Sequence, residues 1–181
     1  MSTTTHLMTA DELFRLPDDG MRHELIKGEL LTMSPPGEEH GVVTVNLTIL
    51  LGQYVRSHNL GTMYAAETGF KVESDPDTVL APDIAFIRRE RVGVLSKRYR
   101  AGAPDLVVEV LSPSDRKGKV EEKTSRWIAL GALTVWLVNP LTRTIEVVLS
   151  NGERTLFGED DYLTGDPIVP GFRLRVAEIF V

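Results

Sequence analysis

Two acidic residues stand where a carboxylate needs an explanation. Asp83 lies near the start of the apolar segment APDIAFI (81–87), and Glu109 is the one charged residue within LVVEVL (106–111). An ionised carboxylate among valines and leucines is costly unless it has a charged partner or binds a cation. If the two segments are neighbouring strands, both side chains can point to one edge of a sheet. Two carboxylates, completed by a backbone carbonyl and water, predict a Mg²⁺ or Mn²⁺ site.

Each carboxylate also has a structural interpretation. Asp83 is compatible with a turn where a strand begins, and Glu109 with a buried ion pair to an arginine. A helix that follows the loop SPSD (112–115) carries Lys119 and Lys123 one turn apart on the same side. Near an attacked phosphate, such an ammonium would stabilise developing negative charge or help to orient and deprotonate water. The alternative is a solvated basic helix face.

Composition limits the class of protein. The 181 residues include no cysteine, which excludes a disulfide scaffold, thiolate metal centres and a cysteine nucleophile. The length and a hydrophobic content of 42% predict a single domain over residues 1–181. No apolar stretch approaches the roughly 20 residues that a membrane helix needs, and the first residues do not resemble a secretory signal. We therefore expect a cytoplasmic protein without a membrane partner.

Charge is unevenly distributed along the chain. The total is −6, but residues 88–126 contain 11 Lys/Arg and 6 Asp/Glu, a local balance of +5. The middle of the chain could therefore face a polyanion such as the DNA backbone while the remainder keeps the protein in solution. Solvated loops and an exposed helix surface are the alternative explanation.

Hydrophobic periodicity and turn residues predict a mixed α/β sheet. The capping box Thr9-Ala-Asp-Glu12 predicts a short helix over 10–16, and RHELI and ELLTM flank Lys27-Gly28 as a hairpin. Segments 62–66 and 69–73 are expected to be paired strands or one bent strand. The other expected elements are a helix at 40–58, strands at 83–87 and 106–111, a basic helix at 117–130, a strand at 134–139 parallel to 106–111, and a β-rich, antiparallel tail.

The order and spacing of several short motifs resemble the Uma-type restriction endonuclease family of the PD-(D/E)xK nuclease superfamily. The resemblance runs from about residue 9 to 181, and its motifs are Pro82-Asp83, Glu109-Val110-Leu111-Ser112-Pro113-Ser114, Lys123 and Val135-Trp136-Leu137-Val138-Asn139-Pro140, with RHELIKGEL upstream, Met33-Ser34-Pro35-Pro36, His40 and Pro170-Gly171-Phe172-Arg173-Leu174.

The resemblance implies a restriction-endonuclease-like mixed sheet with an αβββαβ core, an N-terminal hairpin and a β-rich C-terminal extension. It implies that Asp83 and Glu109 are metal ligands, with the Val110 carbonyl as a third. The superfamily usually has a lysine two residues after the glutamate, where this chain has Leu111, and Lys123 on the following helix takes that role. The family often has a tyrosine four residues after this lysine. Here Trp127 replaces it, so we expect the phenol hydrogen bond to be lost and the aromatic packing to be kept.

Two further residues are secondary catalytic candidates. Glu67 ends a predicted strand beside the expected site, where it would be a further metal ligand, would hold a metal-bound water, or is a surface charge. His40 opens the long helix, where it would meet a substrate phosphate or have a structural role.

The leading hypothesis is an endonuclease that hydrolyses phosphodiester bonds in DNA with Mg²⁺, or Mn²⁺, as cofactor. The alternative is a catalytically inactive nuclease-like module that binds nucleic acid or a protein. A glycan hydrolase with a carboxylate pair ranks lower, because 7% aromatic residues leave little for sugar stacking. Exposed strand edges in the hairpin or the tail would be covered in a homodimer.

Overall fold

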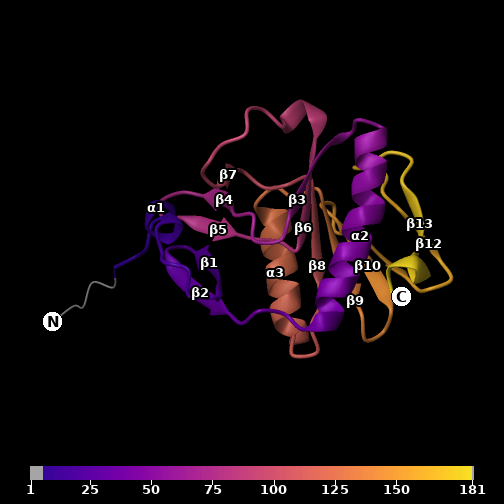
Figure 1. Cartoon of the computed structure of the whole chain (residues 1–181), viewed down its shortest axis with the longest axis horizontal. Helices are drawn as coiled ribbons and strands as arrows, with labels where there is room; N and C mark the ends of the chain where they lie inside the picture. Colours follow the sequence, from indigo (N-terminus) through magenta and orange to yellow (C-terminus); the bar gives the residue numbers. More distant parts are fainter. Residues whose placement is uncertain (1–5, 181) are drawn as a thin grey trace.

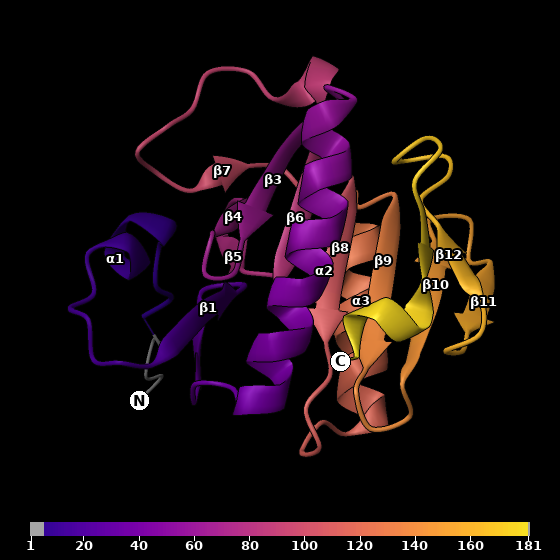
Figure 2. The same ribbon diagram turned by 45° about the vertical axis from the view of Figure 1, so that its right-hand side comes forward.

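The computed structural model describes residues 6–180, and its centre is a six-stranded sheet. The long helix α2 (Glu38–Ser57) covers one face of this sheet and α3 (Lys117–Ala129) covers the other, as Figures 1 and 2 show. Strands β8 and β9 are parallel and all other neighbours are antiparallel. The strand order is β11 (Arg154–Phe157), β10 (Thr144–Leu149), β9 (Thr134–Asn139), β8 (Leu106–Val110), β6 (Ile84–Arg88) and β3 (Gly61–Ala65).

The central strand β8 is buried along its whole length because both of its faces are covered. Leu106, Val108 and Val110 pack on the α2 side. Val107 packs on the α3 side, and Glu109 also faces that side because side chains alternate along a strand. The apolar run that the sequence shows is therefore a two-sided core strand with one carboxylate set into it.

A second, five-stranded sheet lies beside the first. Its order is β2 (Glu29–Met33), β1 (Arg22–Ile26), β5 (Thr78–Leu80), β4 (Phe70–Glu73) and β7 (Arg100–Ala101). The predicted hairpin is confirmed, with positive φ angles of 49° at Lys27 and 80° at Gly28 closing a two-residue turn. The predicted capping box at Thr9 is also confirmed, and it begins the short helix α1 (Ala10–Phe14).

One expectation about the strands is wrong. Segments 62–66 and 69–73 neither pair with each other nor form one bent strand, because β3 pairs with β6 while β4 pairs with β5 and β7 in the other sheet. Between them Glu67 has a φ of 71°, so the chain turns sharply out of the six-stranded sheet. The short strand β5, which the sequence did not predict, gives β4 its partner.

The C-terminal extension is β-rich, as expected. Strands β12 (Tyr162–Thr164) and β13 (Arg173–Arg175) form a small antiparallel sheet, and the chain then enters the 3₁₀ helix η2 (Val176–Ile179). Apolar side chains of this region, among them Val169 and Phe172, complete the core on the α2 side.

The predicted core order is confirmed, with α2, β3, β6, β8, α3 and β9 following one another along the chain. The strands β4, β5 and β7 and the 3₁₀ helix η1 (Arg89–Arg91) lie in the connections between these core elements. None of the helices within residues 6–180 combines the length and apolar character needed to span a membrane.

Candidate active site

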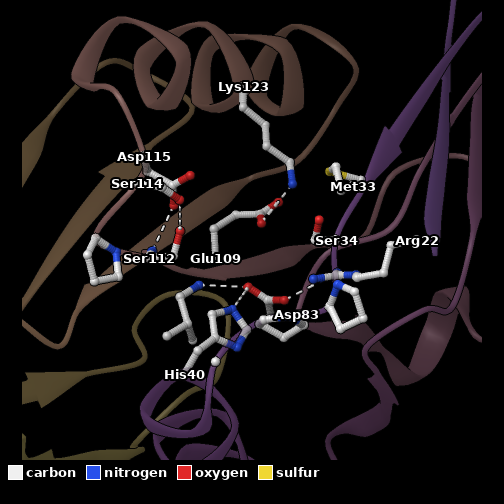
Figure 3. Close-up of a pocket in the computed structure, with 15 residues that line it drawn as sticks. Arg22, Met33, Ser34, His40, Asp83, Glu109, Ser112, Ser114, Asp115 and Lys123 are labelled. Atoms are coloured by element: carbon white, nitrogen blue, oxygen red, sulfur yellow. Dashed lines mark hydrogen bonds and ion pairs between the residues drawn. The ribbon is translucent and has the colours of Figure 1, made fainter. Parts of the chain in front are cut away.

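The strands that carry the two carboxylates are neighbours. In the antiparallel ladder Ile84 lies opposite Val108, so Asp83 and Glu109 are the next opposed positions where the ladder ends. Both residues line one open pocket of about 600 Å³ beside the first turn of α2 and the side chain of Lys123. Figure 3 shows the two carboxylates facing this shared space.

Asp83 is held by three donors from three parts of the chain. Its Oδ2 accepts hydrogen bonds from His40 Nε2 at 3.1 Å and from the Val110 amide at 2.9 Å. Its Oδ1 accepts one from Arg22 Nη2 at 3.3 Å. Burial opposes ionisation, but the hydrogen bond and charge of His40, the Val110 amide and the Arg22 charge together hold the pKa of Asp83 below its ordinary value. The group is therefore a fixed anion at the floor of the pocket.

Glu109 has fewer compensating contacts. Its Oε2 accepts a hydrogen bond from Lys123 Nζ at 2.9 Å, and its Oε1 accepts one from Trp127 Nε1 at 2.8 Å. Burial raises its pKa to about 7; Lys123 counteracts this rise, whereas the charges of Asp83 and Glu24 add to it. Burial therefore disfavours the ionised form of Glu109, and Lys123 offsets this effect only in part.

Trp127 supplies a hydrogen bond that the sequence did not predict. It has no phenol hydroxyl, but its indole N–H donates to Glu109 from a fully buried ring. An indole N–H is a donor only, which suits a carboxylate acceptor. The aromatic packing is kept as predicted, because Trp127 belongs to the core on the α3 side.

Lys123 connects two acidic side chains. Its Nζ lies 2.9 Å from Glu109 Oε2 and 3.5 Å from Glu24 Oε1. Burial lowers the pKa of Lys123, but the charges of Glu109 and Glu24 outweigh this effect and the net shift is upward. Lys123 is therefore a persistent cation. Of the two roles that the sequence left open, charge stabilisation suits it better than removing a proton from water.

Arg22 and Glu24 are site residues that sequence reasoning missed. Both belong to β1 and share one face of that strand, which brings them against the end of the six-stranded sheet. Glu24 is buried and accepts a hydrogen bond from the Ala81 amide at 3.0 Å. The signal was present in the segment RHELI, where opposite charges two residues apart in a predicted strand must lie on the same side.

The secondary candidates have different positions. His40 reaches the site and donates to Asp83. Glu67 pairs with Arg22 Nε at 3.1 Å with a side chain that is 62% exposed, and it does not line the pocket. Lys119 lies on the same side of α3 as Lys123, as expected, and lines a smaller neighbouring pocket with it, but its Nζ pairs with Glu122 at the surface, at 2.8 Å.

The basic segment 88–100 lies away from the carboxylates. Asp83 immediately precedes β6 and Arg88 ends it, so the segment leaves the sheet at the opposite end, as Figure 2 shows. Arg88 and Arg91 both pair with the buried Asp105. These two arginines stabilise the fold at a distance from the pocket rather than lining it.

The sequence profile of the Uma2 family, described as "Putative restriction endonuclease", matches residues 10–177. The chain belongs to the Uma2 family. A solved structure described as "a putative nuclease belonging to DUF820 from Anabaena variabilis ATCC 29413" has the same fold, with a TM-score of 0.80 and 21% sequence identity over 96% of this chain and 97% of that chain. A comparison with curated proteins gives no match. The predicted family and restriction-endonuclease-like fold are thus confirmed.

The donor set of this Uma2 protein fits a hard divalent cation. Within residues 6–180 no group of three or more His, Cys, Asp or Glu side chains is arranged to hold a metal, so the protein would supply two carboxylates and backbone oxygen. Each oxygen of Glu109 accepts one hydrogen bond and retains a free lone pair. Three acids, Glu24, Asp83 and Glu109, adjoin two permanent cations, Arg22 and Lys123. The excess of negative charge beside an open pocket is the environment that such a cation stabilises.

Proposed function

We propose that this Uma2 protein is a divalent-metal-dependent endonuclease that hydrolyses phosphodiester bonds in DNA in the cytoplasm. The observation that carries the proposal is the convergence of Asp83, Glu109 and Lys123 on one open pocket. Membership of the Uma2 family supports nucleic acid as the substrate class.

The residues have distinct roles in this proposal. Asp83 and Glu109, with the Val110 carbonyl, would hold Mg²⁺ or Mn²⁺. A cation of this kind neutralises charge on the attacked phosphate and acidifies a water molecule. Lys123 stabilises the negative charge that develops on the phosphate, at a position set by its contact with Glu109.

Other side chains orient the two carboxylates. His40 and Arg22 restrict the rotation of Asp83 from opposite sides, and Trp127 restricts Glu109. Such contacts keep the reacting groups in one arrangement, so that less free energy is spent on ordering them during the reaction.

The basic residues nearest to the pocket are suited to contact the DNA backbone. Arg116 and Lys117 are exposed and directly follow Asp115, which lines the pocket. Neither forms an ion pair within the described part of the chain, unlike Arg88 and Arg91. We therefore assign the phosphate contacts to the start of α3 rather than to residues 88–100.

The test is cleavage of supercoiled plasmid DNA in the presence of Mg²⁺ or Mn²⁺. Wild type is expected to nick or linearise the plasmid, and Asp83→Ala and Glu109→Ala to lose this activity. The matched control is Asp160→Ala, which removes an exposed carboxylate paired with Arg175 outside the pocket. Equal cleavage by all four proteins would mean that a contaminating nuclease is responsible and would refute the proposal.

A module that binds nucleic acid without cutting it is the second candidate. It is favoured by the fact that both carboxylates already have positively charged partners, Arg22 and Lys123. Salt-sensitive DNA binding that persists in EDTA, without cleavage under any divalent metal, would support this candidate over the first.

A further inference from the structure

Helix α2 has a second row of apolar side chains that is largely exposed, although its first residue, Val42, borders a shallow pocket with Arg143 and Phe180. Its buried face consists of Val43, Leu47, Leu51 and Val55. On the opposite side Val42, Val45 and Ile49 are 42%, 52% and 58% exposed. These three positions recur every three to four residues and therefore form one stripe along the helix. In Figure 2 α2 runs along the front of the sheet and no other element lies over its outer side.

The two ends of this stripe carry opposite charges. Glu38 is in the first turn of α2 and Arg56 in the last, and both are exposed. They are 18 residues apart, which is five helical turns, so they lie on the same side as the three apolar residues. Neither forms an ion pair within residues 6–180. The outer stripe, defined as Glu38, Val42, Val45, Ile49 and Arg56, therefore has an acidic beginning, an apolar middle and a basic end.

We propose that the outer stripe is a homodimer interface, in which α2 packs antiparallel against α2 of a second copy about a twofold axis near Leu47. Positions equally distant from residue 47 then meet across the axis. Val45 faces Ile49, Val42 faces Gly52, where the missing side chain gives room, and Glu38 faces Arg56. Every contact occurs twice because the interface is isologous.

The charge pattern selects a second copy as the occupant. A helix with an acid at its start and a base at its end is complementary to itself only when the two helices run in opposite directions. Packing of the apolar middle would remove three exposed β-branched side chains per chain from water. The proposed interface differs from the exposed strand edges that the sequence suggested as dimer contacts. Among these edges, β2 is the main alternative interface, because its Leu30 and Leu31 are 41% and 43% exposed.

This arrangement leaves both candidate sites accessible. His40 lies on the side of α2 that faces Asp83, not on the outer stripe. Two His40 residues, each seven residues from the axis, would be about 20 Å apart along the helix direction. The proposal does not depend on nuclease activity, since it concerns only the outer surface of α2.

The first experiment measures mass in solution by sedimentation equilibrium. Wild type is expected to be a dimer at micromolar concentration, and Val45→Glu/Ile49→Glu to be a monomer with an unchanged circular dichroism spectrum. The control Leu30→Glu/Leu31→Glu alters the exposed residues of β2 and should remain dimeric. A monomeric wild type, or a dimer that survives the α2 substitutions, would overturn the proposal, and loss of the dimer only in the β2 variant would place the interface at that edge.

The second experiment tests the antiparallel arrangement by exchanging charges. Glu38→Arg and Arg56→Glu each place like charges opposite one another twice in the dimer, and each is expected to raise the dimer dissociation constant about tenfold. The double variant restores opposite charges and should return the constant to near the wild-type value. This rescue cannot arise from a folding defect, so its absence would refute the antiparallel pairing of these two positions.

Discussion

The two ends of the β6–β8 pair bury acidic side chains in different ways. At one end Asp105, fully buried, accepts hydrogen bonds from the Arg88 amide at 2.9 Å, Arg88 Nε at 3.0 Å and Arg91 Nη1 at 2.8 Å. At the other end Asp83 and Glu109, together with Glu24, share the charges of Arg22 and Lys123 beside an open pocket. The first end, which we call the closed end, has two arginines for one buried acid, although Arg88 also contacts the exposed Glu90; the second, the open end, has two permanent cations for three buried acids.

This difference distinguishes an ionic cluster whose buried acid is satisfied within the chain from one that, in the proposed function, binds a divalent cation. The Asp105 cluster satisfies its acid from within the chain. The cluster around Glu109 contains more acids than permanent cations, and the pKa of Glu109 is raised to about 7, mainly by burial and further by the charges of Asp83 and Glu24. Strong pKa shifts beside an open pocket are more typical of functional sites than of structural ion pairs.

The largest expected effect is on activity at the open end. Asp83→Asn keeps the shape of the side chain but removes the charge that would hold a cation, so DNA cleavage should fall by about 10²-fold or more. Plasmid cleavage per folded protein measures the change. The matched variant is Asp105→Asn at the closed end, which should retain the wild-type rate per folded molecule. Equal losses in the two variants would remove the functional distinction between the ends.

The next effect concerns stability at the closed end. Asp105→Asn leaves Arg91 without its carboxylate and Arg88 with only the exposed Glu90, and since both arginines are partly exposed we expect a loss of about 2–3 kcal/mol in the free energy of unfolding. Urea unfolding followed by circular dichroism measures this. Asp83→Asn should cost less, because removing a charge from an acid-rich cluster also relieves repulsion of Glu109. A larger loss of unfolding free energy in Asp83→Asn than in Asp105→Asn would mean that the open end, not the closed end, contributes more to stability.

The open end should also respond to pH through Glu109. Folding raises the pKa of this group from 4.5 to about 7, so the proton stabilises the folded state fully below pH 4.5, and this contribution is lost as pH rises to about 7. A divalent cation competes with the same proton. As pH rises towards 7, the apparent dissociation constant for Mn²⁺ should therefore decrease by up to about tenfold per pH unit. Above pH 7 it should become constant.

Calorimetric titration of Mn²⁺ at several pH values measures this dependence. Glu109→Gln is the control, because it has no proton to lose and should bind weakly at every pH. An affinity in wild type that does not change between about pH 5 and pH 8 would show that Glu109 is not a ligand.

The smallest effect is expected at Glu67. This exposed side chain pairs with Arg22 but lies outside the pocket lining. Glu67→Gln should change the free energy of unfolding by less than about 0.5 kcal/mol and cleavage by less than about twofold. Urea unfolding and initial cleavage rates test this. A tenfold loss of cleavage would show that Glu67 belongs to the catalytic residues, as the sequence suggested, and that the site extends beyond the pocket lining.

The sequence alone predicted the elements that have strong local signals. The strand Thr134–Asn139 has the predicted bounds, and α2, α3 and β8 differ from theirs by at most two residues at either end. The periodic apolar segments and the turn at Lys27-Gly28 depend on residues close together in the sequence, so the sequence alone is enough to predict them. Asp83 and Glu109 could also be selected as candidates from the sequence, since a charge within an apolar strand is recognisable without coordinates.

Only the tertiary structure decided which acidic side chain pairs with which basic side chain. The partner of Asp83 is Arg22, 61 residues away, and the second acid at Lys123 is Glu24, 99 residues away; the segment 70–73 pairs in a different sheet from 61–65. Residues 88–100, the first part of the segment 88–126 whose positive charge balance suggested a contact with DNA, lie at the opposite end of β6. Electrostatic pairing depends on distance in space and on burial, and neither is encoded in the spacing of residues along the chain.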